Sequence, residues 1–340
     1  MKRILTLGVL LLVVALVAAG CGGSGGQQQQ QQSQQGSEQP APAAQEQKMV
    51  LATGGTAGTY YPLGGGMASI WNSKLQGYNV TAQATGASVE NLRLVEQKEV
   101  ELALTQNDIA EYAHKGIEAF EGQAITSSVG IATLYPEVIQ IIVPKESPIK
   151  SITDLKGRKV SVGAPGSGNE ANARQILDAF GLSYKDIEPF YLSYAESADQ
   201  FKDNHIDVIM LTTGAPNAGI QDVATVKAIR VLPFTEEEVK KIQEKYPFFS
   251  TFTLPANTYT GQTEDVLTIA VQACFFGHKD LPEDVVYDLT KTLWENKDEL
   301  ARINAKAEYM DPDDPVKGIT VPIHPGALKY YKEAGVTNLP

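Results

Sequence analysis

Short apolar stretches alternate with helix-like stretches over most of this chain, and this alternation limits its fold more than any other feature. The first three apolar stretches, at 48–55, 78–86 and 100–106, are separated by patterns typical of amphipathic helices. An order of strand, helix, strand, helix and strand predicts a parallel sheet covered by helices. Further pairs follow up to an apolar strand at 266–278 and a single late helix at 283–303. The sequence therefore predicts an α/β fold.

The N-terminus has the pattern of a bacterial lipoprotein signal over residues 1–20. A positively charged start is followed by an apolar run at 4–17, and small residues then lead to Cys21. Cleavage before Cys21 would leave its thiol free to carry lipid, so we expect an extracytoplasmic protein anchored to the cell membrane. An ordinary secretory signal with a chance cysteine is the alternative.

A low-complexity segment follows at 21–48. It is rich in Gly, Ser and Gln and contains no large apolar side chain, so it cannot contribute to a packed core. Such a composition is typical of a flexible tether. We expect the globular part of the protein to begin at residue 49.

Composition restricts the partners and the chemistry of the globular part. The net charge of −12 argues against binding to nucleic acid or directly to anionic lipid, although a pocket can oppose the global field for a small anion. If Cys21 carries lipid, Cys274 is the one remaining thiol and cannot form an intramolecular disulfide. Because Cys274 lies in an apolar strand, we expect it to be buried and unreactive.

Three loops rich in Gly, Ser and Thr share one chemistry, at 53–66, 84–91 and 163–170. Each follows a strand and precedes a helix, which places it at the sheet edge where α/β proteins bind ligands. Helix N-termini at this edge offer unpaired N–H groups and partial positive charge to an anion. We therefore expect a shared pocket for a small polar solute, which Arg93 and Arg174 in the following helices could reach. The alternative is that these turns are only structural.

Single residues near the same strand ends are the candidates for contact with the ligand. Ser88 is predicted to cap its helix, and Ser167 with Glu170 has the spacing of a capping box. Gln106 and Thr213 follow later strands, and for both of them surface capping and ligand contact remain equally open.

Catalytic patterns are weak by comparison. Segment 166–171 fits the G-x-G-x-x-A pattern of a dinucleotide loop, with Glu188 at a suitable distance, but Asn169 stands where a phosphate loop needs lysine. The four histidines are scattered, and no G-x-S-x-G elbow is present. We expect no catalytic residue, no metal and no cofactor. An extracytoplasmic enzyme or nucleotide-binding protein that uses this loop remains the alternative.

Five segments in this order resemble the TAXI family, the extracytoplasmic solute receptors of TRAP transporters. They are TGGTAGTYYPLGG (53–65), TGASVENLRLV (85–95), DLKGRKVSVGAPGSGNE (154–170), IDVIMLTTGAP (206–216) and PIHPGALKYYKEAG (322–335). The similarity covers nearly all of residues 49–335. Ala87 departs from the pattern, since the family usually has a second glycine there.

The resemblance implies a type II periplasmic-binding-protein fold of two α/β lobes with a ligand cleft between them. The first lobe would combine 49–135 with the C-terminal part of 251–340, and the second lobe would span 136–250. Closure would present a surface to the subunits of a sodium-coupled membrane transporter, and relatives bind glutamate, dicarboxylates or 2-oxoacids. A solute receptor that feeds a sensor kinase would have the same sequence features.

The resemblance also implies a set of ligand-binding residues by their positions in the motifs. They are Gly55, Thr56, Tyr60, Tyr61, Ser88, Asn91, Gln106, Asn107, Ala164, Ser167, Gly168, Asn169, Thr212 and Thr213.

The lipoprotein signal generates the first testable prediction. Replacing Cys21 by Ser should release the protein from the membrane fraction, because serine offers no thiol to carry lipid. Fractionation of cells, with mass spectrometry of the parent protein, measures both effects. Membrane association that survives Cys21→Ser, together with a parent protein that carries no lipid, would contradict the prediction.

Overall fold

The computed structural model describes residues 46–340, so the predicted signal and most of the predicted tether lie outside the described residues. The strands are β1 (Gln47–Ala52), β2 (Tyr78–Gln83), β3 (Leu102–Gln106), β4 (Ser128–Pro144), β5 (Lys159–Ser161), β6 (Glu188–Phe190), β7 (Val208–Thr213), β8 (Ile229–Val231), β9 (Ser250–Leu254) and β10 (Val266–His278). The helices are α1 (Tyr60–Lys74), α2 (Ser88–Glu96), α3 (Asn107–Lys115), α4 (Gly168–Ala179), α5 (Tyr194–Lys202), α6 (Ala218–Val226), α7 (Glu236–Lys245), α8 (Glu283–Glu295), α9 (Lys297–Ile303) and α10 (Pro325–Glu333). Short 3₁₀ helices occur at Glu118–Phe120, Ile152–Leu155 and Ala305–Tyr309. None of the helices described over residues 46–340 is long and apolar enough to cross a membrane.

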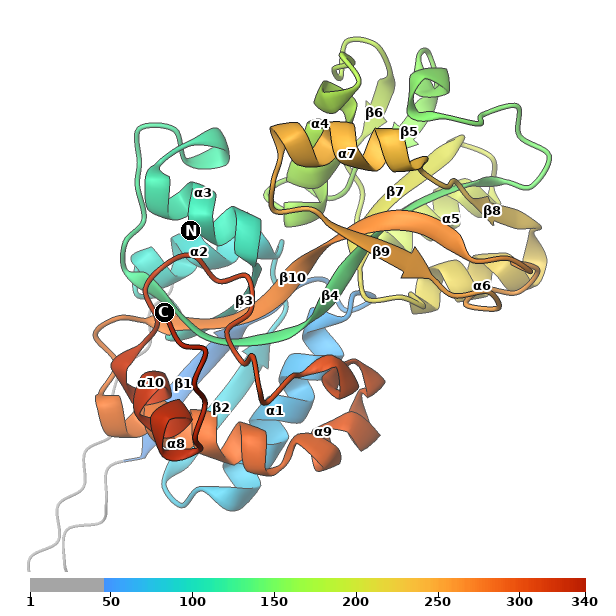
Figure 1. Ribbon diagram of the computed structural model, residues 1–340. Coiled ribbons are helices and arrows are strands. Elements are labelled where there is room, and N and C mark those ends of the chain that lie inside the picture. The colour runs from blue at the N-terminus through green and yellow to red at the C-terminus, as the bar shows by residue number, and fades with distance from the viewer. Residues whose placement is uncertain (1–45) are drawn as a thin grey trace, which may run out of the picture. The chain divides into compact units, whose positions relative to one another are not determined.

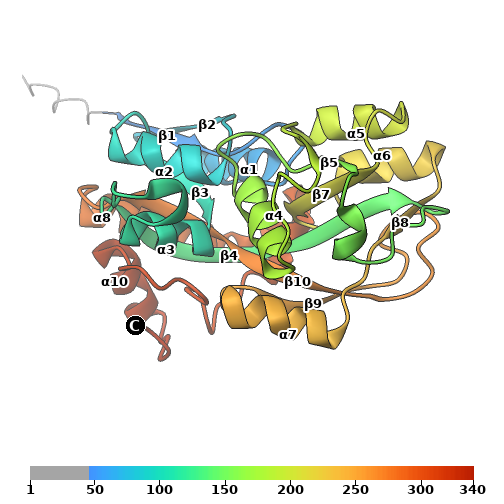
Figure 2. The same cartoon turned by 90° about the horizontal axis from the view of Figure 1, so that it is seen from above.

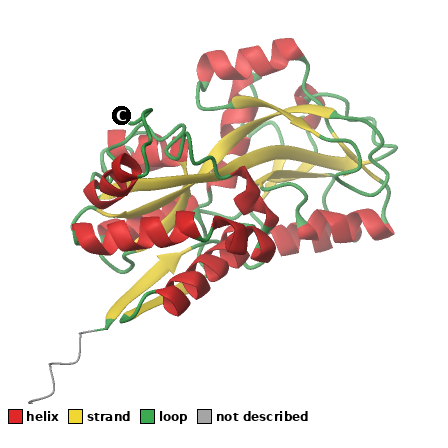
Figure 3. Cartoon of the chain, turned by 60° about the horizontal axis from the view of Figure 1, so that its bottom comes forward, coloured by secondary structure: helices red, strands yellow, loops and turns green. Residues whose placement is uncertain are grey.

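The strands form one mixed sheet in the order β2-β1-β3-β10-β4-β7-β5-β6, with β8 paired to β4 and β9 paired to β10. β1 is parallel to β2 and β3, and β5 is parallel to β6 and β7. Helices cover both faces of the sheet (Figure 3). The α/β class predicted from the sequence is therefore confirmed. The expected parallel order is incomplete, because β4 and β10 are antiparallel to each neighbour with which they pair.

Two long antiparallel strands, β4 and β10, connect the two lobes of the fold (Figure 1). Their pairing runs from Ser128 opposite His278 to Val138 opposite Ala270. The sequence pattern predicts a strand only at 137–145, whereas β4 begins at Ser128. The first half of β4 is buried almost throughout, and such a strand lacks the alternation of apolar and polar residues that would reveal it.

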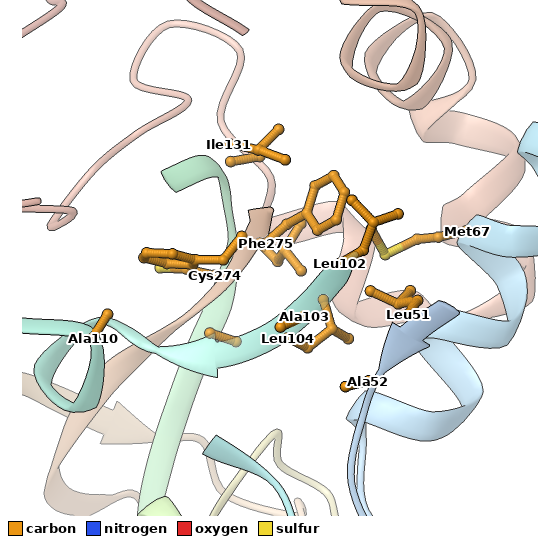
Figure 4. Close-up of a cluster of buried hydrophobic side chains, with 14 of the residues drawn as sticks. Leu51, Ala52, Met67, Leu102, Ala103, Leu104, Ala110, Ile131, Cys274 and Phe275 are labelled. Atoms are coloured by element: carbon orange, nitrogen blue, oxygen red, sulfur yellow. The ribbon is translucent and has the colours of Figure 1, made fainter. Parts of the chain in front are cut away.

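Separate hydrophobic cores stabilise the lobes. One core takes its side chains from residues 49–135 and 273–331, with a single alanine from α4, and two further clusters take theirs from 139–271. Figure 4 shows part of the first core, where Cys274 and Phe275 of β10 lie among residues of β1, β3 and α1. Cys274 is fully buried, as predicted, and burial raises the pKa of its thiol.

The C-terminal helical region differs from the prediction. The sequence predicts one helix over 283–303, but α8 ends at Glu295 and α9 begins at Lys297. Asn296 separates the two helices, and its side-chain amide donates to the carbonyl of Thr292 at 2.8 Å. Asparagine side chains that bond to nearby backbone groups compete with helix continuation, which accounts for the break.

Candidate ligand-binding site

The Gly-rich loops before α1, α2 and α4 meet around one small cavity. Its lining residues are Gly54, Gly55, Gly58, Thr59, Tyr60, Ala87, Ser88, Gln106, Tyr135, Glu137, Ser167, Gly168, Asn169, Tyr194, Thr212 and Thr213. The cavity volume is about 40 Å³, and an adjoining cavity of about 90 Å³ shares several of its walls. A buried water needs about 10–15 Å³ of such space. The first cavity in this conformation therefore has room for about three waters, and the adjoining cavity adds further space.

The positive ends of three helices point to this region. Tyr60, Ser88 and Gly168 are the first residues of α1, α2 and α4, and all three line the cavity. The first N–H groups of a helix have no partner within it, so they can donate to an anion. In Figure 2, α4 lies between the helices α2 and α3 on one side and α5 and α6 on the other.

Ten of the fourteen predicted ligand-binding residues line one of the two cavities. They are Gly55, Tyr60, Ser88, Gln106, Ala164, Ser167, Gly168, Asn169, Thr212 and Thr213. Their contact with a ligand remains a prediction.

The other four predicted residues lie elsewhere. Thr56 and Tyr61 line neither cavity, and both side chains are exposed to solvent. Asn91 and Asn107 are buried, but their amides are already used inside the first lobe. Asn91 Nδ2 donates to the carbonyls of Thr53 and Leu104. Asn107 Nδ2 donates to the carbonyl of Gly318, and its Oδ1 accepts from the N–H of Gln272 on β10. These asparagines hold backbone segments together, which a motif alone does not distinguish from ligand binding.

The two serines at the helix starts differ in their roles. Ser167 caps α4, because its Oγ accepts from the N–H of Glu170 at 3.1 Å, and it also donates to the carbonyl of Ala164 at 2.7 Å. The predicted cap at Ser88 is wrong, since Ser88 is already the first residue of α2. Its Oγ instead accepts from the backbone N–H of Gln106 at 3.2 Å and so joins α2 to the end of β3.

The sequence analysis missed Glu137, the one carboxylic acid among the described residues that line the cavity. Glu137 lies on β4 and is only 3% exposed. Gln106 Nε2 donates to one of its oxygens at 2.7 Å, and the Tyr135 hydroxyl donates to the other at 3.2 Å. Burial raises the pKa of Glu137 to about 7, although the hydrogen bonds from Gln106 and Tyr135 oppose the shift. The available signal was an acidic residue inside an otherwise apolar strand.

Two polar atoms beside Glu137 have no hydrogen-bond partner among residues 46–340. They are the hydroxyl of Tyr60 and the Oε1 of Gln106, and both belong to buried side chains that line the cavity. A buried polar atom without a partner costs free energy of about 1–3 kcal/mol. These atoms are therefore available to a bound molecule.

Direct hydrogen bonds also join the lobes near the cavity. Thr59 Oγ1 and Thr213 Oγ1 are 3.2 Å apart, and Asn217 Nδ2 donates to the carbonyl of Ala57 at 3.2 Å. Lys306 Nζ donates to the carbonyl of Ala215. The lobes are thus in direct contact beside the cavity in this structure.

A second group of contacts joins α3 and its neighbourhood to α4. Asn172 Nδ2 donates to Asp108 Oδ2 at 2.8 Å, and both side chains are buried. Arg174 pairs with Glu118 at 2.6 Å near the surface. Burial raises the pKa of Asp108 to about 6. Arg174 is therefore engaged outside the cavity.

No lysine or arginine appears among the described residues that line the cavity. Arg93, which the sequence analysis placed within possible reach, donates instead to the carbonyl of Ala119 and lies over the ring of Phe120. Positive charge at the site therefore comes from helix N-termini and not from side chains.

The loop at 166–171 has little room for a phosphate in this structure. A Cβ added to Gly168 would lie 2.0 Å from Gln106 Oε1 and 3.0 Å from Ser88 Oγ. Both neighbours belong to the other lobe. Among residues 46–340, no group of three or more His, Cys, Asp or Glu side chains is placed to hold a metal ion.

Comparisons with known proteins agree with this architecture. Residues 51–335 match the NMT1-like family. A solved structure from Bordetella bronchiseptica RB50 has a TM-score of 0.52 at 18% identity, and covers 86% of this chain and 90% of that chain. The periplasmic aliphatic sulphonate binding protein from Escherichia coli has a TM-score of 0.44 at 15% identity, covering 84% and 83%. The predicted periplasmic-binding-protein fold is confirmed.

One curated relative matches over a shorter length. A protein of Escherichia coli (strain K12), described as an aliphatic sulfonates-binding protein, is 35% identical over 79 residues. The match spans 23% of this chain and 24% of that protein, about a quarter of each.

The buried carboxyl of Glu137 generates a prediction about stability and pH. Its pKa of about 7 in the folded protein exceeds its ordinary value of 4.5, so the folded state holds the proton more tightly than the unfolded state. The resulting stability is complete below pH 4.5 and is lost as the pH rises through 7. In the absence of solute, Glu137→Gln should therefore be as stable as the parent at pH 4.5. At pH 8 it should be more stable, by about 3 kcal/mol.

Urea unfolding at several pH values measures this difference. Glu99→Gln is the matched control, because it removes the same charge from an exposed position. If the stability difference between Glu137→Gln and the parent were the same at pH 4.5 and pH 8, Glu137 would not be a buried, proton-binding carboxyl.

Proposed function

Because the chain belongs to the NMT1-like family, we propose that it is an extracytoplasmic receptor that captures a small polar solute between two lobes and delivers it to a membrane transporter. The observation that carries the proposal is the cavity where helix N-termini and polar side chains of both lobes meet. A site built from both lobes couples the presence of a solute to their closure.

The proposed mechanism of capture is closure of the two lobes around the solute. The contacts between Thr59 and Thr213, and between Asn217 and Ala57, hold the lobes together around the cavity. The solute can enter only when these contacts open, and bending of the β4 and β10 pair would allow such an opening. A solute that binds the closed form better shifts the population toward it. The transporter would then recognise the closed form.

We propose an anionic or zwitterionic organic solute of the glutamate, dicarboxylate or 2-oxoacid class. The N-termini of α2 and α4, at Ser88 and Gly168, would hold its carboxylate through backbone N–H groups. The ten predicted residues that line the cavities are the proposed contacts, and Thr59, Tyr135, Glu137 and Tyr194 join them. Sulfonates are a second class to test, because one relative is named for them. They come second because that match covers only a quarter of the relative's length.

The proposed partner is a sodium-coupled transporter of the TRAP type, and the proposed location is the outer face of the cell membrane, with a lipid at Cys21. The support is the resemblance of the five sequence segments to TAXI receptors. Transport in vesicles that depends on a sodium gradient and not on ATP would test the partner. Dependence on ATP would indicate an ABC system, and signalling without transport would indicate a sensor kinase.

An enzyme that uses the loop at 166–171 is the weaker candidate. The polar atoms of Ser167 and Asn169 in this loop are engaged in capping and in backbone contacts, so they offer no activated group to a substrate. Glu188, the expected partner of a dinucleotide ribose, is exposed at the start of β6.

A thermal-shift screen of the purified protein tests the proposal. Organic acids, amino acids and sulfonates are added one at a time, and a solute that binds the folded state should raise the melting temperature by mass action. No shift with any compound, or a shift only with nucleotides, would contradict the proposed function.

The close approach at Gly168 generates a third prediction. Gly168→Ala should weaken binding of the best solute from the screen at least tenfold, because its Cβ would strike Gln106 and Ser88 of the other lobe and keep the lobes apart. The helix itself should tolerate alanine well. Gly65→Ala is the matched control, since Gly65 lies in α1 and nothing is within 4 Å of its added Cβ.

Isothermal titration and melting curves of both variants provide the measurement. Parent-like affinity in Gly168→Ala would mean that binding does not require the lobes to approach as closely as in this structure.

A further inference from the structure

We propose that Glu137, Gln106 and Tyr60 form a subsite for the protonated amine of the solute, so that the receptor selects amino acids over dicarboxylates and 2-oxoacids. The inference rests on the proposed capture of a solute in this cavity and names the chemical group that the cavity selects.

The first argument is the charge of the cavity. Glu137 is nine-tenths or more buried and lines the cavity, while no lysine or arginine among the described residues does so. An ionised carboxylate is costly to bury unless a positive charge accompanies it. The hydrogen bonds to Glu137 come from an amide and a phenol, both of which are neutral. A cationic group on the solute would supply the missing charge.

The second argument is the count of donors and acceptors. An ammonium group has three donors and no acceptor. Each oxygen of Glu137 accepts one protein hydrogen bond and keeps capacity for another, while Gln106 Oε1 and the hydroxyl oxygen of Tyr60 have no partner. The site therefore offers an ammonium acceptors from three side chains. A carboxylate in the same position would face the acceptor oxygens of Glu137 and Gln106.

The third argument is the opposite polarity of the adjacent wall. Ser88 and Gly168 begin α2 and α4, and the N-termini of these helices favour negative charge. One wall of the cavity thus suits a carboxylate, and the wall formed by Glu137 suits an amine. A small zwitterion matches both walls, whereas a dicarboxylate or a sulfonate matches only the first.

The titration of Glu137 gives the proposal a second signature. The titratable groups around Glu137 are Tyr60 on α1, Asp108 on α3, Tyr135 on β4, Tyr194 on α5 and Cys274 on β10. Burial raises the pKa of each tyrosine and of the thiol, so these groups stay neutral at pH 5–8. Asp108 is the other acid, with a pKa raised to about 6. An ammonium favours the ionised form of both acids, so binding should release protons.

Isothermal titration of the purified protein with matched pairs of solutes is the decisive experiment. Each amino acid is compared with the 2-oxoacid of the same carbon skeleton, beginning with L-glutamate and 2-oxoglutarate, and glutarate lacks both groups. The amino acid should bind about ten- to a hundredfold more tightly than its 2-oxoacid, because it gains hydrogen bonds to a charged group. Its affinity should fall several-fold from pH 8 to pH 5.5. The measured binding enthalpy should vary with the ionisation enthalpy of the buffer, because the buffer takes up the released protons.

Variants separate this subsite from the rest of the cavity. Glu137→Gln should lose at least tenfold in affinity for the amino acid and should bind glutarate as well as the parent does or better. It should also lose the part of the pH dependence that comes from Glu137, while Asp108 keeps the remainder. Glu99→Gln, which removes an exposed carboxylate away from the cavity, should behave like the parent.

The outcomes distinguish the two proposals. A 2-oxoacid, dicarboxylate or sulfonate that binds as tightly as the amino acid would overturn the amine subsite and leave solute capture intact. Tight binding of an amino acid that Glu137→Gln does not weaken would also overturn it. If no member of any of these classes bound the parent, the proposed function would fail, and the subsite with it.

Discussion

The antiparallel pairing of β4 with β10 is the interaction on which the rest of this structure depends. These strands belong to both lobes, so they join the two cores and form the connection across which the lobes can move. The pairing is irregular between Ala273 and Cys274, opposite the segment that leads to Tyr135 and Glu137. Bulges of this kind redirect side chains. Residues two apart on a strand share a face, which accounts for Tyr135 and Glu137 lining one cavity.

The groups that would bind a solute lower the stability of the empty, closed protein. The buried carboxyl of Glu137 and the unpartnered atoms of Tyr60 and Gln106 weaken the empty closed form, since none of them is fully compensated by the protein. The same groups would be compensated by a solute with a positive charge. An empty receptor would then favour opening, and an occupied receptor would favour closure, without any further device.

The sequence predicted the elements that follow a repeating pattern. The first three strands, the cap at Ser167 and the meeting of three Gly-rich loops all follow from local rules that the structure confirms. Asn91 and Asn107 show the limit of a motif, because an amide that holds backbone groups and an amide that binds a ligand give the same sequence pattern. Glu137 was missed because its importance comes from the burial of β4, which only the tertiary structure reveals. The predicted lobe boundaries and the lipid anchor remain predictions.

A crystal structure of the protein with its tightest-binding solute would test the central claim most directly. The account predicts a solute enclosed between the lobes, with a nitrogen about 3 Å from the carboxylate of Glu137 and a carboxylate at the N-termini of α2 and α4. A solute bound outside this cavity, or one that places a carboxylate against Glu137, would contradict it.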